Sequence, residues 1–106
     1  MKLPVLHDPW DIVDPQESDA VVQELARELG PQHALKGKKV RAVARRCDCD
    51  DVLFTIIEEE RCAVVHLTFQ GKEETDPRWP ATEFYSSVAE WVERCMLPDH
   101  RDYVSV

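Results

Sequence analysis

Three apolar runs in the middle of the chain, separated by short polar links, constrain the fold more than any other feature. They are residues 40–46, 52–58 and 62–69. The middle run is almost entirely apolar and β-branched, as in a central strand, while the first alternates and is expected to place Val40, Ala42 and Ala44 on one face. Strands joined by so few residues pair as antiparallel hairpins, so the sequence predicts a three-stranded antiparallel meander.

A helix over residues 15–29 is predicted before the meander. Asp14 can cap it, Pro15 suits the first helical position, and Glu17 follows the cap by three residues. An apolar stripe at helical spacing follows, made of Val21, Val22, Leu25, Ala26 and Leu29. The Gly30-Pro31 pair is a typical helix stop.

A second helix is predicted after the meander, beginning near Thr82 as a cap and ending at Pro98. Its apolar face contains Phe84, Val88, Trp91, Val92 and Cys95. The helical spacing of Trp91 indicates a core residue.

The fold class predicted from these elements is α+β, in a single domain over residues 1–106. It is a two-layer sandwich in the order helix, three-stranded antiparallel meander, helix, with both helices on one side of the sheet. The other face of the sheet is then open and is a candidate interface. Residues 1–14 are expected to form an irregular N-terminal arm that docks onto the body.

The charge balance disfavours nucleic acid and anionic membranes as partners. The chain has 13 basic and 21 acidic residues and a formal net charge of −8. No apolar run approaches the length of a membrane helix, and the N-terminus lacks the apolar region of a signal peptide, so a cytoplasmic location is expected. There the four cysteines would stay reduced.

The loop over residues 70–81 is the strongest candidate for an interface. Trp79 stands beside Arg78, and this pair of residue types is typical of interface anchors. The other candidates are Lys72, Glu73, Glu74 and Asp76 in the same loop and Trp10 in the N-terminal arm. The alternative for Trp79 is that it folds back and closes one end of the core.

A basic segment, residues 36–46, suggests a second function. It holds Lys36, Lys38, Lys39, Arg41, Arg45 and Arg46 without an acid. Such a strip could bind nucleic acid, with Trp10 or Trp79 as a stacking platform. Alternatively it pairs with the acids that follow it in the sequence.

A metal site or an active site is a third alternative, with weaker support. Cys47 and Cys49 could hold a soft metal together with Cys62 or His66, but the second ligand pair of a zinc site is missing. The acidic turn of residues 48–51 lacks the glycine and glutamate of a calcium loop. No nucleophile motif accompanies the histidines, so no catalytic residue, metal ligand or cofactor is predicted.

Residues 65–103 resemble small, largely uncharacterised bacterial proteins, some of which are similar to immunity proteins of toxin systems. The matching segments are His66-Leu67-Thr68-Phe69, Gly71-Lys72-Glu73-Glu74, Trp79-Pro80, Phe84-Tyr85-Ser86-Ser87, Trp91, Met96, Pro98-Asp99-His100 and Asp102-Tyr103. The resemblance implies a bacterial source and an inhibitor-like role, and it transfers no functional residues. The leading hypothesis is a non-enzymatic protein-binding module, such as an inhibitor of a basic effector.

Overall fold

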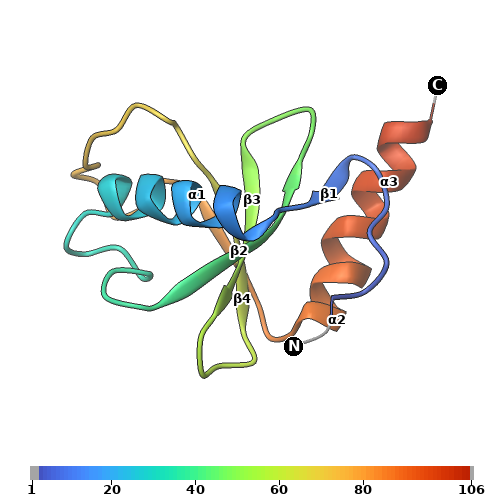
Figure 1. Ribbon diagram of the computed structural model, residues 1–106, viewed down its shortest axis with the longest axis horizontal. Coiled ribbons are helices and arrows are strands. Elements are labelled where there is room, and N and C mark those ends of the chain that lie inside the picture. The colour runs from blue at the N-terminus through green and yellow to red at the C-terminus, as the bar shows by residue number, and fades with distance from the viewer. Residues whose placement is uncertain (1–2, 106) are drawn as a thin grey trace.

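The computed structural model describes residues 3–105 and shows a five-stranded antiparallel sheet with two helical segments (Figure 1). The strands are β1 (Trp10–Ile12), β2 (Val40–Arg46), β3 (Asp51–Ile56), β4 (Cys62–His66) and β5 (Thr82–Tyr85). They lie in the sheet in chain order, β1-β2-β3-β4-β5. The predicted meander corresponds to β2, β3 and β4, and the structure adds one strand at each edge.

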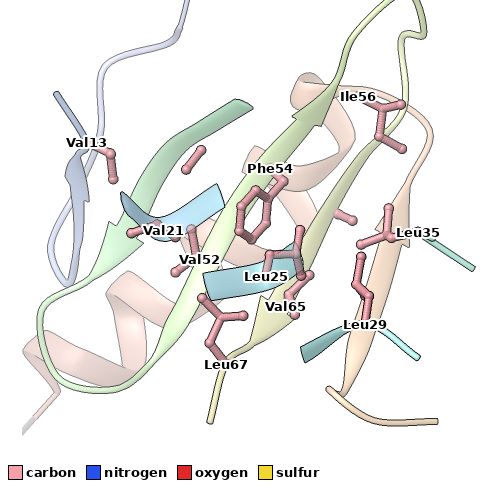
Figure 2. Packing of buried hydrophobic residues seen from close by; sticks show 12 residues of the cluster. Val13, Val21, Leu25, Leu29, Leu35, Val52, Phe54, Ile56, Val65 and Leu67 are labelled. Carbon is pink, nitrogen blue, oxygen red and sulfur yellow. The ribbon is translucent and has the colours of Figure 1, made fainter. Parts of the chain in front are cut away.

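The first helix, α1 (Pro15–Glu28), follows the sequence prediction closely. The Asp14 carboxylate accepts the backbone N–H of Glu17 at 2.8 Å, which satisfies one of the unpaired donors of the first turn. The apolar stripe packs onto one face of the sheet, where Leu25 lies beside Phe54 and Val65 (Figure 2). Each buried leucine or phenylalanine of this kind stabilises the fold by about 1.5–3 kcal/mol.

The C-terminal helix, residues 88–104, covers the opposite face. It comprises α2 (Val88–Trp91), a π-helical turn (Val92–Met96) and α3 (Leu97–Val104). Its Trp91 and Met96 pack with Leu53 of β3, whereas the neighbouring Val52 belongs to the α1 core. Because successive strand residues point to opposite faces, the two cores lie on opposite sides of the sheet (Figure 1). The prediction that both helices share one face is therefore wrong.

A β-bulge in β2 changes which of the two cores the following residues of this strand face. Ala42 pairs with Phe54 and Ala44 with Leu53, so Val43 is an extra residue in this strand. Consequently Ala42 is buried in the α1 core and Ala44 in the other one. The predicted common face of these two alanines is wrong because the bulge reverses the alternation.

Both ends of the predicted second helix are also corrected. Thr82 begins β5, and the helix instead starts after Ser87, whose hydroxyl accepts the Glu90 N–H at 3.1 Å. Pro98 does not end the helix, because the π-helical turn precedes it and the Leu97 N–H reaches Val92 O. Within residues 3–105 no helix is both long and apolar enough to cross a membrane.

Candidate functional site

A loop of residues 68–81, here called the anchored loop, connects β4 to β5 and is fixed to α1 by buried carboxylates. The Glu28 side chain is 0% exposed and accepts the backbone N–H groups of Thr68 and Phe69, both at 2.9 Å. Glu24 accepts the Gly71 N–H at 3.1 Å. Phe69 and Gly71 have positive φ angles, of 56° and 69°, so the backbone here takes the left-handed conformation.

The two carboxyl groups lie one helical turn apart, and the hydrogen bond between them lowers the pKa of Glu24. Burial raises the pKa of Glu28, and the neighbouring Glu24 carboxyl raises it further, while the Thr68 and Phe69 N–H groups oppose this shift. Arg27 binds Glu24 at 3.0 Å and supplies a counter-charge. The pair therefore serves as an acceptor site for loop backbone that is shielded from water.

A second attachment holds the middle of the anchored loop against the end of α1. The Glu74 N–H donates to the Glu28 carbonyl at 3.0 Å. Gly30 is buried beneath the loop, and a Cβ atom at this position would collide with the Glu74 carbonyl oxygen. The close approach explains why glycine follows Leu29 here.

His33 fixes the far end of the loop. Its ring is 5% exposed, and Nδ1 accepts the Leu35 N–H at 3.0 Å. This contact leaves Nε2 as the ring donor, which lies 3.1 Å from the Pro80 carbonyl oxygen. The Thr82 hydroxyl donates to the same carbonyl at 2.9 Å. Both ends of the anchored loop are thus held by buried or half-buried polar groups.

Between these attachments the tip of the loop has its own short-range order. The Arg78 guanidinium binds the Asp76 carboxylate at 2.6 Å and lowers the pKa of Asp76 to about 2. The Trp79 N–H donates to the Asp76 carbonyl at 3.0 Å. Trp79 remains 50% exposed, and the Arg78 side chain is 82% exposed. The tip presents an aromatic ring and an arginine to solvent.

The remaining interface candidates lie in different environments. Lys72 and Glu73 are exposed on the anchored loop, and Glu74 is half-buried. Trp10 is 1% exposed and belongs to the core, where its Nε1–H donates to Asp99 at 2.9 Å. Trp10 is therefore not on the surface beside the loop, because its indole fills the core under the C-terminal helix.

Half of the basic residues of the segment 36–46 are paired with the protein's own acids. Lys38 binds Glu59 at 2.9 Å, Arg45 binds Glu17 at 3.1 Å, and Arg46 binds Asp48 at 2.8 Å. Among residues 3–105, no ion pair involves Lys39 or Arg41. The basic residues of this segment that stay without an acidic partner in the described chain are Lys36, Lys39 and Arg41.

The thiols and histidines do not converge on one site. None of the four cysteines forms a disulfide, and burial raises the pKa of Cys62 to about 11 and of Cys95 to about 12. His66 pairs with Asp51 at 2.7 Å on an exposed part of the sheet. In the described part of the chain, no group of three histidine, cysteine or acidic residues is placed to hold a metal ion.

Sequence reasoning did not identify Glu24, Glu28 and His33, which position the candidate site. A signal was present for the two acids, since Glu28 follows Val21 and Leu25 at the spacing of the apolar stripe. An acid at a core-facing position needs hydrogen-bond donors. The donors come from a segment forty residues later in the chain and could not be assigned by spacing.

No family model, curated protein or solved structure matches this chain. The resemblance of residues 65–103 to small bacterial proteins therefore stays an interpretation of the sequence. What the chain can bind is inferred from its own geometry and charge.

Proposed function

We propose that this protein is a non-enzymatic protein-binding module that uses the anchored loop, with Trp79 as the central contact. One observation supports this most directly: the loop backbone is fixed by buried Glu28 and His33, yet Trp79 is half exposed. A loop already held in one conformation loses little entropy on binding. Tryptophan and arginine are the side chains that most often dominate binding energy at interfaces.

The partner that fits this surface is a basic protein. The net charge of −8 favours rapid encounter with a positively charged effector such as a nuclease toxin. Glu73 and Glu74 lie next to the tip and add local negative charge, whereas Asp76 is already paired with Arg78. An inhibitor or immunity role is also what the sequence resemblance implies.

The other two candidate functions have less support. Nucleic-acid binding through residues 36–46 is weakened because three of its six basic residues are paired with acids. The buried Trp10 cannot stack with bases from the surface. A metal site would need the scattered thiols to meet, and the raised pKa of Cys62 and Cys95 disfavours the thiolate form that binds metals.

The experiment is to co-express the protein with the products of neighbouring genes and to measure the affinity of any complex by calorimetry. Trp79→Ala should weaken the complex by roughly thirtyfold, as for a hot-spot residue. Tyr103→Ala is the matched control, since Tyr103 is 48% exposed on the C-terminal helix. Equal losses in both variants, or no loss in Trp79→Ala, would contradict the proposal.

A further inference from the structure

In the described chain, one edge of the sheet has no neighbouring strand along residues 40–42 of β2. β1 pairs only with residues 44–46 of this strand, and the Val13 N–H adds one bond to the Val43 carbonyl at 3.2 Å. The chain then turns into α1. Within residues 3–105, no strand therefore lies beside residues 40–42 on that side. An open edge of this kind presents backbone groups that an additional strand can use.

The direction of these backbone groups follows from the register. The Lys39 carbonyl accepts the Ile57 N–H at 2.9 Å, so the alternate peptide groups of Val40 and Ala42 point away from β3. The Ala42 N–H agrees with this, since it donates to the Ser18 hydroxyl at 3.1 Å. The N–H and C=O of Val40 and the C=O of Ala42 therefore face outward, where an incoming strand would lie.

An apolar groove runs between this edge and α1. It consists of two adjoining hollows of about 610 and 310 Å³ that share Val22, Val40 and Ile57. Ala26 lines the smaller hollow, and Asp19 lies on the helix side of the larger one. Ile57 is 43% exposed. This edge groove is large enough to take apolar side chains from one face of an added strand.

The opposite face of the same edge is cationic. Lys39 and Arg41 alternate with Val40 along the chain, so the register places their side chains on the face opposite Val40. Both residues also border the edge groove, Arg41 at the larger hollow and Lys39 at the smaller one. Both are exposed, and neither forms an ion pair with any residue of the described chain. A strand added here would meet apolar side chains on one face and two unpaired cations on the other.

This charge pattern discriminates between possible occupants. If two copies of the protein paired through this edge about a two-fold axis at Val40, Lys39 of one copy would lie opposite Arg41 of the other. Like charges directly opposite in a sheet are destabilising, whereas opposite charges stabilise the pairing. The edge therefore opposes pairing with itself and favours an acidic strand.

We propose that the edge of β2 binds an extended, acidic segment of another protein as an additional strand. Its alternate apolar side chains occupy the edge groove, and its acidic side chains lie beside Lys39 and Arg41. The Val40 N–H and C=O provide the main-chain hydrogen bonds. This site is built from different residues than the anchored loop and is independent of the function proposed for that loop.

The test uses an acetylated and amidated peptide of alternating glutamate and valine, titrated into isotope-labelled protein. Amide chemical shifts should change at residues 38–43, and affinity should fall as salt is added. Two N-methylated peptides identify the main-chain hydrogen bonds to β2. One is methylated at the backbone nitrogen of every valine, and the other at that of every glutamate. One form should lose binding about tenfold or more, and the other should keep it, because only one set of N–H groups can face β2.

Charge reversal provides a second readout. Lys39→Glu combined with Arg41→Glu should weaken the glutamate peptide roughly tenfold and should improve binding of a lysine–valine peptide. The matched control is Lys72→Glu with Arg78→Glu, which changes net charge equally on the anchored loop and should leave affinity within about twofold. The Trp79→Ala variant should bind the peptide normally. If the peptide does not bind the edge of β2, the function proposed for the anchored loop is therefore unaffected.

Several results would overturn the inference. These are equal affinity for the glutamate and lysine peptides, retention of binding by both methylated forms, or shifts confined to the anchored loop. Concentration-dependent dimerisation that Lys39→Glu alone strengthens would assign the edge to a second copy instead, because the new carboxylate would lie opposite Arg41 of the other copy, and analytical ultracentrifugation would detect it.

Discussion

Both sides of the sheet hold an apolar core, but the α1 side also contains the buried polar side chains. In residues 3–105 the buried polar side chains are Ser18, Glu24, Glu28 and His33, all from α1 or the segment after it. The other side is closed by apolar and aromatic groups, with Trp10 and Trp91 in edge-to-face contact at a centroid distance of 5.1 Å. Both candidate binding surfaces lie next to the polar side.

This difference separates two tasks. Apolar burial is non-directional and stabilises the fold as a whole. Hydrogen bonds are directional, so a buried acceptor fixes a particular backbone group. Glu28 fixes backbone N–H groups of the anchored loop, and the Ser18 hydroxyl fixes the Ala42 N–H at the open edge of β2. Apolar burial therefore supplies stability on both sides of the sheet, and the α1 side in addition positions the surfaces that could contact a partner.

Removal of Trp91 should produce the largest effect and would sharpen the comparison. Trp91 is 0% exposed, so Trp91→Ala should lower the free energy of unfolding by about 3–5 kcal/mol. Replacing the half-exposed Trp79 with alanine should change the free energy of unfolding by no more than about 0.5 kcal/mol. Urea denaturation followed by circular dichroism measures both. Similar losses would show that Trp79 is a core residue.

Glu28→Gln should have the next largest effect, and it should act on the anchored loop in particular. Glutamine has one side-chain acceptor oxygen, so one of the two half-buried N–H groups, of Thr68 or Phe69, loses its partner. The expected loss is about 1–3 kcal/mol, with faster amide exchange in the loop. Gln23→Ala, at an exposed site of α1, is the control and should change neither.

The same variant predicts a change in pH dependence. Burial raises the pKa of Glu28 above its ordinary value of 4.5, so the folded state binds this proton more tightly than the unfolded chain. Its contribution to stability is complete below pH 4.5 and is lost as pH rises through the folded-state pKa. Glu28→Gln should therefore lose less stability than the native protein over this window. Urea titrations at several pH values measure this difference. If the free energy of unfolding of the native protein and of Glu28→Gln depends on pH in the same way, the idea is wrong.

Ser18→Ala should have the smallest effect and probes the open edge. The variant removes the acceptor of the Ala42 N–H, at a cost of about 1 kcal/mol. The released N–H then faces the edge groove, so the glutamate–valine peptide should bind somewhat more tightly than to native protein. Thermal denaturation and the peptide titration test the two parts separately. Weaker peptide binding would indicate that Ser18 itself contacts the ligand.

Local patterns in the sequence predicted the elements with strong signals and missed those that depend on neighbours. The cap at Asp14 and the stripe through Leu25 place α1 correctly. For the residues of β1 the sequence predicts an irregular arm, because three residues carry little periodic signal. Trp10 becomes a strand residue only by pairing with Arg46. The Ser87 and Glu90 capping pair was visible in the sequence and marks the true start of the second helix.

The candidate site divides in the same way. The sequence places Trp79 and Arg78 in a loop rich in turn-forming residues, but only the structure decides that Trp79 is exposed and does not close the core. The attachment of this loop through Glu28 does not follow from the sequence, since an acid in a helix pattern is normally assigned to the solvent side. The open edge at Val40 depends on where β1 ends, which the sequence pattern left undefined.

By itself the sequence determined an α+β chain with a central apolar strand, a capped first helix and an acidic surface, because periodicity, caps and charge are local properties. Only the tertiary structure decided that the helices cover opposite faces, that Val43 forms a bulge and that Glu28 holds a loop forty residues away. These features depend on long-range pairing, where one extra strand residue or one buried acceptor changes which side chains meet.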